Sequence, residues 1–357
     1  MYPLRKGLYA KQAHLNLPEG TYEEEHGREG FYGKVSHLYR LHPPTSWTRI
    51  EGNLKPRAYN CNIIENDEKA HIILYNSDLV IYTHRLTRDM PYYYRNADGD
   101  EVRFIHEGQG VLETDFGAMA FTKGDYLVIP RGTTYRIKVE QPIFCLLVES
   151  FSEINQPERG LLGPNALYDP ATIETPEPSP IIDDREWELK IKRLGEETSV
   201  FYPFNPIDVV GWKGDLSVWK ISIKDICPVI SHRAHIPPSV HSTFIGSKFV
   251  ICSFVPRPLE SEEGALKVPF YHRNIDYDEV IFYHDGDFFS RDGIKPGTIT
   301  FHPQGIHHGP HPKALKNSSK KEKTDEYAVM IDARNPLIPS EDAQKVEWKE
   351  YYMSWKE

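Results

Sequence analysis

The residues best suited to chemistry in this sequence are histidines and carboxylates gathered in its last third. Imidazole and carboxylate side chains can hold a divalent transition metal or move protons. Any single histidine is more often a surface or loop residue, so the candidates have to be selected by their spacing. Nine of the sixteen histidines fall within residues 232–311, namely His232, His235, His241, His272, His284, His302, His307, His308 and His311.

One segment occurs twice in the chain, once with a histidine and once without it. Residues 269–286 read PFYHRNIDYDEVIFYHDG, and residues 91–108 read PYYYRNADGDEVRFIHEG. Aligned without gaps, they share Arg-Asn, Asp-Glu-Val, a late histidine and a closing glycine, but Tyr94 stands where the second copy has His272. Internal repetition of this kind indicates a duplicated architecture.

A second stretch repeats in the same order. GDYLVIPRGTTY at 124–135 matches GTITFHPQGIHH at 297–308, and the shared pattern ends in Tyr135 in the first copy and His308 in the second. The first repeat therefore has tyrosine at both positions where the second has histidine. We expect the first repeat to bind no metal and the second to carry the chemistry.

The spacing in the second copy resembles the metal site of cupin proteins. The places of the two histidines, the glutamate and the glycine of the first cupin motif are occupied by His272, Asn274, Glu279 and Gly286, and the second motif ends in His308. The predicted ligands are therefore His272, Glu279 and His308. Two imidazoles and one carboxylate form the facial triad of non-haem Fe(II) oxygenases, which leaves coordination positions open for substrate and O₂.

The neighbouring Asp278 is an alternative carboxylate ligand. We favour Glu279 because its spacing to Gly286 fits the motif. The first repeat keeps both acids, as Asp100 and Glu101, so the repetition does not separate the two alternatives.

Composition argues against several other classes of protein. The chain has 357 residues, a length typical of about two domains, and a net charge of −10 without a basic face, which argues against nucleic acid as a partner. Its four scattered cysteines form no CxxC pair, which argues against a disulfide framework or a zinc–thiolate site. Without a signal-like stretch or an apolar run of about 20 residues, we expect no membrane association and a cytoplasmic protein.

Short strand-like runs separated by glycine and proline predict an all-β fold. Together with the repeats, they indicate duplicated cupin (jelly-roll β-barrel) domains followed by a short C-terminal helix within 340–355, with Ser340 as its N-cap. We expect an N-terminal region with the metal-less repeat at 1–150, a connector at 151–200, and the metal-bearing repeat at 201–357.

These motifs resemble the homogentisate 1,2-dioxygenase family. The matching text is FNPIDVVGWKGD at 204–215, RAHIPPS at 233–239, PFYHRN at 269–274 and HGP at 308–310. The resemblance implies a pair of jelly-roll-like domains with one Fe(II), held by His272, Glu279 and His308. It also implies a homo-oligomer built on trimers.

The resemblance also implies roles for residues outside the triad. His235 would act as acid/base on a substrate hydroxyl, and Arg291, where the family has lysine, would pair with a substrate carboxylate. Phe288 stands where the family has a tyrosine in the substrate pocket. His302 matches another family histidine, which either lines the pocket or sits on a strand.

The function implied is Fe(II)- and O₂-dependent ring cleavage of homogentisate to maleylacetoacetate, a step in tyrosine and phenylalanine catabolism. Two departures keep alternatives open. Phe288 leaves gentisate or another hydroquinone-type acid as the substrate, and six residues, where the family has five, separate His272 from Glu279, a count that would favour Asp278. A zinc or manganese cupin isomerase is disfavoured because Asn274 replaces its fourth ligand, and a metal-free bicupin is disfavoured by the intact second repeat.

Overall fold

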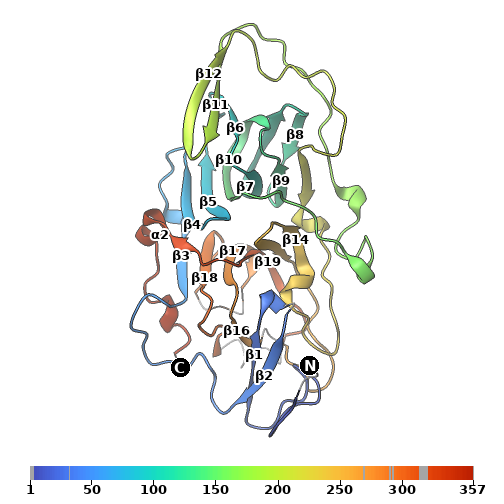
Figure 1. The fold of residues 1–357 in the computed structure, drawn as a ribbon, viewed down its shortest axis with the longest axis vertical. Helices are drawn as coiled ribbons and strands as arrows, with labels where there is room; N and C mark the ends of the chain where they lie inside the picture. The colour runs from blue at the N-terminus through green and yellow to red at the C-terminus, as the bar shows by residue number, and fades with distance from the viewer. Residues whose placement is uncertain are drawn as a thin grey trace.

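Two large β-sheets, one from each repeat, and a third small sheet form the body of the protein (Figure 1). The computed structural model describes residues 4–31, 33–267, 270–288, 291, 293–312 and 321–356, without the side chains of Leu161 and Asn274. The predicted replacement of a cupin ligand by Asn274 therefore lies outside the described part. The fold is all-β with duplicated cupin-like domains, as the sequence predicted.

The first sheet is built mainly from the first repeat. Its eleven strands follow the order β12-β11-β6-β10-β5-β4-β20, with β7, β8, β9 and β13 joined to it through β10. The strands are β4 (Ala70–Tyr75), β5 (Leu79–Leu86), β6 (Tyr93–Asn96), β7 (Asp100–Thr114), β8 (Gly117–Phe121), β9 (Asp125–Ile129), β10 (Thr134–Ser150), β11 (Trp187–Arg193), β12 (Glu196–Tyr202), β13 (Trp219–Ser222) and β20 (Ile338–Pro339).

The second sheet has six strands in the order β14-β15-β19-β17-β18-β3. They are β3 (Arg57–Asn60), β14 (Ser242–Ile245), β15 (Phe249–Phe254), β17 (Asp278–Asp287), β18 (Thr298–His302) and β19 (Asp325–Ala333). The third sheet contains β1 (Tyr22–Gly27), β2 (Val35–Arg40) and β16 (Tyr271–Asn274), and β1 runs parallel to β16 with Glu25 opposite His272. The N-terminal segment is thus part of the environment of a predicted metal ligand.

Equivalent residues of the two repeats meet where the sheets pack together. The rings of Phe104 and Phe282 lie 6.3 Å apart, and Nδ1 of His106 lies 2.9 Å from Nδ1 of His284. Each pair occupies matching positions in the aligned segments 91–108 and 269–286. Self-matching contacts are the mark of two-fold symmetry, so the repeats are related by a pseudo-two-fold axis through this core.

Strand pairing crosses the predicted domain boundaries. β3 closes the edge of the second sheet against β18, while β13 and β20 from the C-terminal half pair with β9 and β4 of the first sheet. Within the predicted connector, β11 and β12 form a hairpin that extends the first sheet through parallel pairing of β11 with β6. The predicted domain boundaries at residues 150 and 200 therefore stay a prediction. Each sheet contains strands from both halves of the chain.

The C-terminal helix is shorter than the predicted span of 340–355. α2 covers Glu341–Lys345, with the Ser340 side chain accepting the Ala343 amide, and a 3-10 turn follows at Tyr351–Met353. Between them the Trp348 amide donates to Ala58, so this stretch pairs beside β3 instead of continuing the helix. Other 3-10 turns lie at Glu29–Phe31, Cys61–Ile63, Gly160–Leu162, Pro170–Thr172, Ile223–Asp225 and Pro238–His241.

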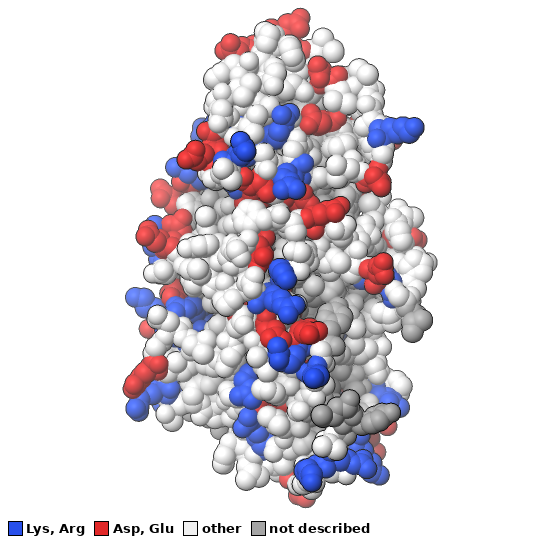
Figure 2. All heavy atoms as spheres, viewed as in Figure 1, with Lys and Arg blue, Asp and Glu red and all other residues white. Residues whose placement is uncertain are grey.

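Charges are mixed on the face shown in Figure 2, where acidic and basic side chains alternate without a continuous basic area. Among the described residues, no helix has the length and apolar character needed to cross a bilayer.

Candidate metal centre and adjoining cavity

The three predicted ligands converge in the second barrel. His272 lies on β16, Glu279 near the start of β17, and His308 six residues beyond the end of β18. Two backbone hydrogen bonds of 2.9 and 3.0 Å join His272 to His308. Oε2 of Glu279 lies 3.7 Å from Nε2 of His272 and 3.4 Å from Nε2 of His308, so three donor atoms face one small volume.

The donor set fits a divalent transition metal. His308 is only 1% exposed, yet neither of its ring nitrogens has a hydrogen-bond partner among the described residues. Burying such atoms without a partner is costly, and a metal bound at Nε2 would satisfy one of them. Nδ1 of His272 lies 3.2 Å from the Phe270 carbonyl, an outer contact that leaves Nε2 for a metal.

The protonation states also suit a metal. Burial lowers the pKa of His308 to about 3, so the imidazole is neutral near pH 7. Burial alone would raise the pKa of Glu279, but the neighbouring imidazoles, His308 foremost, hold it well below its usual range. Neutral imidazoles and an ionised carboxylate are the forms in which these side chains bind metals.

The structure brings Glu279, rather than Asp278, to the two histidines. Side chains alternate along a strand, so the adjacent acids on β17 point to opposite faces. The Asp278 carboxylate accepts the backbone N–H groups of Gln304 at 2.7 Å and Leu337 at 2.6 Å. It is therefore engaged in holding two loops on the far side of the strand.

His302 lies behind Glu279 and outside the cavity lining. Its Nδ1 lies 2.7 Å from Oε1 of Glu279, its ring stacks on His308 at 4.9 Å, and its Nε2 lies 3.2 Å from the Tyr351 hydroxyl. These contacts orient the carboxylate and one imidazole. Of the two places the sequence allowed for His302, the structure shows the strand position, where the side chain would position a ligand and not contact substrate.

A cavity adjoins the triad and contains two of the predicted substrate residues. Its lining includes His272 and Glu279 as well as His235 and Arg291. Nδ1 of His235 lies 3.1 Å from Oε1 of Glu260 and 3.1 Å from Nη2 of Arg257. Because arginine can only donate, the tautomer in which Nδ1–H donates to Glu260 is the one that leaves an unprotonated Nε2 for a bound substrate.

Arg291 and Phe288 have different surroundings. Arg291 lines the cavity and is held there by a 2.8 Å hydrogen bond from Nη1 to the Gly309 carbonyl. Phe288 instead packs edge-on against Tyr283, with ring centroids 4.9 Å apart, in a small apolar cluster. Tyr283, not Phe288, is the residue of this pair that lines the cavity.

The cavity residues that the sequence analysis missed include Tyr283, Arg257 and Glu326. Tyr283 could have been found, because Glu279, Ile281 and Tyr283 alternate along β17 on its cavity face. Arg257 and Glu326 belong to no motif. They reach the cavity only because β15, which Arg257 follows, pairs with β19, which carries Glu326.

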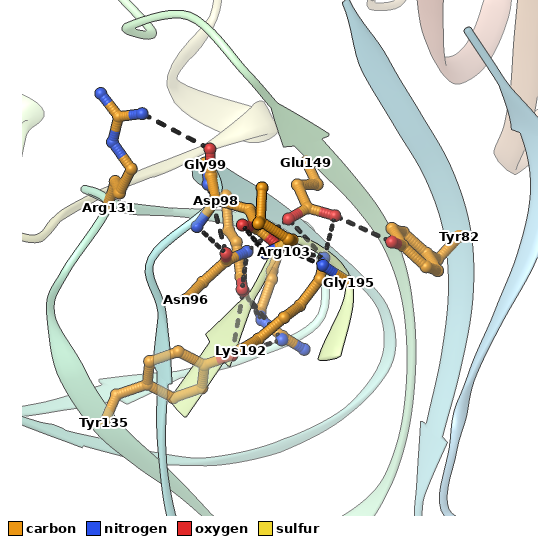
Figure 3. Close-up of polar contacts among 12 residues, drawn as sticks. Tyr82, Asn96, Asp98, Gly99, Arg103, Arg131, Tyr135, Glu149, Lys192 and Gly195 are labelled. Carbon is orange, nitrogen blue, oxygen red and sulfur yellow. Dashed lines mark hydrogen bonds and ion pairs between the residues drawn. The ribbon is translucent and has the colours of Figure 1, made fainter. Parts of the chain in front are cut away.

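The first barrel repeats this geometry with a different chemical content. Tyr135 pairs with Tyr94 across β10 and β6, as His308 pairs with His272. In place of a metal there is a guanidinium: Arg103 donates from Nε to Oε2 of Glu101 at 3.0 Å and from Nη2 to the Tyr135 hydroxyl at 2.7 Å (Figure 3). Glu101 is the counterpart of Glu279, so an arginine provides the positive charge that this carboxylate needs.

A second ion pair completes the polar interior of the first barrel. Glu149 accepts from Lys192 at 2.5 Å, from Tyr82 at 2.8 Å and from Asn96 at 2.7 Å (Figure 3). Both buried carboxylates are thus neutralised by side chains of the chain itself. The absence of metal from this barrel stays a prediction.

Comparisons with known proteins point to one family. The profile of the homogentisate 1,2-dioxygenase N-terminal domain matches residues 57–223, and that of the C-terminal domain matches residues 221–357. A Saccharolobus solfataricus protein named "putative dioxygenase" is 32% identical, with 98% of each chain covered.

More distant relatives include proteins named homogentisate 1,2-dioxygenase. That of Nitrobacter hamburgensis is 28% identical over 74% of this chain and 62% of its own length, and that of Rhodopseudomonas palustris (strain BisB5) is 28% identical over 70% and 59%. The matched region thus spans about 60% of the length of these two relatives. Among solved structures, a cupin 2 conserved barrel domain protein from Leptotrichia buccalis covers 78% of this chain and 96% of its own, at 13% identity and a TM-score of 0.37.

Proposed function

Since the chain belongs to the homogentisate 1,2-dioxygenase family and is therefore a ring-cleaving dioxygenase, we propose that it uses Fe(II) to convert homogentisate to maleylacetoacetate. The observation that carries the proposal is a single cavity that joins two candidate ligands, His272 and Glu279, with His235 and Arg291. A dihydroxylated aromatic acid needs all three functions: a metal, a group that takes a hydroxyl proton, and a cation for its carboxylate.

The iron would be held by His272, Glu279 and His308. An iron held by two imidazoles and one carboxylate would supply the activation of O₂ that ring cleavage needs. His302 and the Phe270 carbonyl fix the rings and the carboxylate that surround it, so little reorganisation is needed when substrate enters.

His235 is placed to move the hydroxyl proton. Burial lowers its pKa, so the imidazole is neutral near pH 7 and can accept a proton at Nε2. Glu260, 3.1 Å from Nδ1, would then stabilise the imidazolium that forms. Arg257, which contacts both groups, keeps Glu260 in place at 3.2 Å.

Replacing His235 with glutamine should lower kcat/KM by about 10²–10⁴-fold, the usual contribution of a positioned acid/base group. The iron content should stay unchanged, because His235 is not one of the candidate ligands. Steady-state oxygen uptake and iron analysis of the same preparation measure both. His232→Gln is the matched control, since His232 is exposed and only three residues away. Unchanged kcat/KM in His235→Gln would remove His235 from the mechanism.

The carboxylate side of the cavity contains one acid as well as two arginines. Arg257 and Arg291 supply positive charge, and the half-buried Glu326 lies in the same lining. Burial raises the pKa of Glu326 to about 7, with Arg257 and Arg291 partly opposing the shift. Below pH 7 this side chain is mostly neutral, and above pH 7 it is an anion beside the proposed carboxylate site.

We therefore expect KM for an anionic substrate to rise as pH increases through about 7, and this rise to be lost in Glu326→Gln. The raised pKa also makes folding stability depend on pH. The contribution of Glu326 to the free energy of unfolding is fully present below the unfolded pKa of 4.5 and is lost as pH rises through about 7. The change in KM is tested by measuring KM from about pH 6 to about pH 8, on both sides of the shifted pKa. The exposed Glu322→Gln is the control. A KM profile in Glu326→Gln that matches the wild type would contradict this assignment.

The proposed function is tested by oxygen uptake with homogentisate after anaerobic loading with Fe(II), with His308→Ala beside the wild type. Uptake that yields maleylacetoacetate and is lost in the variant supports it. Uptake only with gentisate or another hydroquinone would keep the site but change the substrate. Because Phe288 lies behind Tyr283, its departure from the family weighs less against homogentisate than the sequence suggested. Iron that binds without any oxygen uptake would contradict the dioxygenase chemistry at this site.

A further inference from the structure

A second group of imidazoles and carboxylates lies in the N-terminal segment, outside both repeats. Glu23 is on β1, His37 is on β2, and His14 is in the turn that precedes β1. His14 is 5% and Glu23 is 2% exposed, and His37 is half-buried. One donor atom from each residue lies within 4.8 Å of the other two.

The sheet explains why these side chains meet. Glu23 and Glu25 lie on the same face of β1 because strand side chains alternate, and His37 is the cross-strand partner of Glu25. Oε1 of Glu23 lies 2.6 Å from Nδ1 of His14 and 3.4 Å from Nδ1 of His37. A 3.4 Å separation is close to the edge of a tetrahedron with metal–ligand bonds of about 2.0–2.1 Å, whereas the 2.6 Å contact is that of an ion pair and would lengthen on metal binding.

The contacts within this cluster are close ion-pair contacts whose hydrogen-bond alignment is poor. Nδ1 of His14 and Nδ1 of His37 are both buried and have no aligned hydrogen-bond partner among the described residues. The carboxylate is instead fixed from the opposite direction, because the His14 backbone N–H donates to both Glu23 oxygens at 3.1 and 3.2 Å. Buried imidazole nitrogens that lie near a carboxylate but form no aligned hydrogen bond with it could instead bind one cation together with that carboxylate.

The backbone of His14 is also held in an unusual conformation. Its φ is 63°, in the left-handed region that few residues other than glycine adopt. Such a conformation persists where the surroundings require it, often at a binding site. Here it turns the ring toward Glu23 while the amide reaches the same carboxylate.

We propose that His14, Glu23 and His37 bind a second divalent metal ion, with Zn²⁺ as the ion that the ligand types favour. Burial alone would raise the pKa of Glu23, but His14 and His37 lower it to about 2, so the carboxylate is ionised. Burial alone would lower the pKa of His37, but Glu23 raises it, so metal binding competes with protonation of this imidazole. Nε2 of His14 lies 3.7 Å from Oε2 of Glu25, so a second carboxylate lies near this ring without a hydrogen bond to it.

The site would clamp the N-terminal segment against the catalytic strand. The His14 ring stacks on Phe270 at 4.2 Å with an interplanar angle of 16°, and the Phe270 carbonyl is the group next to Nδ1 of His272. β1 also runs beside β16, with Glu25 opposite His272. A metal at the cluster would therefore hold in place both supports of a candidate iron ligand without contacting the iron.

The test separates the two sites by removing the triad first. Full-length His272→Ala/His308→Ala protein is stripped with a chelator, incubated with ZnCl₂, desalted, and analysed for zinc per chain. We expect about one equivalent to remain bound, and Co²⁺ in its place to give the visible absorption of a low-coordinate site. Adding His37→Ala should weaken zinc binding at least tenfold, while adding His42→Ala, an exposed histidine of the same segment, should not.

A conservative variant guards against misfolding. Glu23→Gln keeps the size and most hydrogen-bonding capacity of Glu23 but removes its charge, and it should lose the zinc while its circular dichroism spectrum stays unchanged. The proposal is overturned if the triad-deficient protein keeps no zinc after desalting. It is equally overturned if His37→Ala and Glu23→Gln bind zinc as tightly as their parent, because the cluster would then be only a hydrogen-bonded ion pair.

Discussion

Replacing Glu279 with alanine is expected to remove the metal and to lower ring-cleaving activity at least about a thousandfold, equivalent to about 4 kcal/mol of barrier. The reason is that Glu279 is the one carboxylate that faces both His272 and His308. Without it, two imidazoles remain and no ligand carries a negative charge, so both charge and ligand number are insufficient for Fe(II). Iron per chain and oxygen uptake with homogentisate are the two measurements.

The matched control is the neighbouring acid. Asp278→Asn should retain iron and most of the activity, with a loss of stability as its main effect, because Asp278 holds the Gln304 and Leu337 amides on the far face of β17. If Asp278→Asn lost the metal while Glu279→Ala kept it, the ligand assignment would be reversed. The residue count between the first histidine and the acid, which favours Asp278, would then have been the better guide.

Replacing Arg103 with methionine is expected to lower the free energy of unfolding by about 3–5 kcal/mol, the cost of leaving one partner of a buried ion pair without the other. Arg103 and Glu101 are 4% and 2% exposed, and Arg103 also donates to the Tyr135 hydroxyl. The variant therefore strands a carboxylate in the centre of the first barrel. Equilibrium urea denaturation measures the change.

Two further variants show whether the lost charge is responsible. Adding Glu101→Gln to Arg103→Met removes the stranded charge and should recover a large part of the loss, since paired removal of a buried ion pair is often tolerated. Arg131→Met, in the same barrel but exposed, should change stability little. A double variant no more stable than Arg103→Met would mean that packing, rather than charge, accounts for the effect.

The sequence was sufficient for the fold class and for a candidate triad, because both rest on local patterns. The two repeats locate strands, the glycine spacing selects Glu279, and the exchange of Tyr94 for His272 separates the two barrels. The pairing of Tyr94 with Tyr135 and of His272 with His308 agrees with that alignment. What could not be predicted depends on non-local pairing.

Three features illustrate that limit. Arg257 and Glu326 belong to no motif and enter the cavity through the pairing of β15 with β19, two strands separated by residues 255–324. The helix expected over 340–355 ends at Lys345 because the next residues hydrogen-bond beside β3, so tertiary pairing overrides local propensity. Nothing in the sequence distinguishes Arg103 from other charged residues of a strand. Its pairing with Glu101 and Tyr135 depends on the closed barrel.

The exchange of strands between the two halves has a consequence for biosynthesis. The catalytic sheet takes its edge strand, β3, from residues made early, whereas the first sheet waits for β20, made more than 260 residues after its partner β4. The first sheet therefore cannot be completed until the second half of the chain has been made. Co-translational folding of the first repeat would thus stop at an incomplete, edge-exposed intermediate, and a ribosome pausing between the repeats would prolong its exposure to aggregation or chaperones.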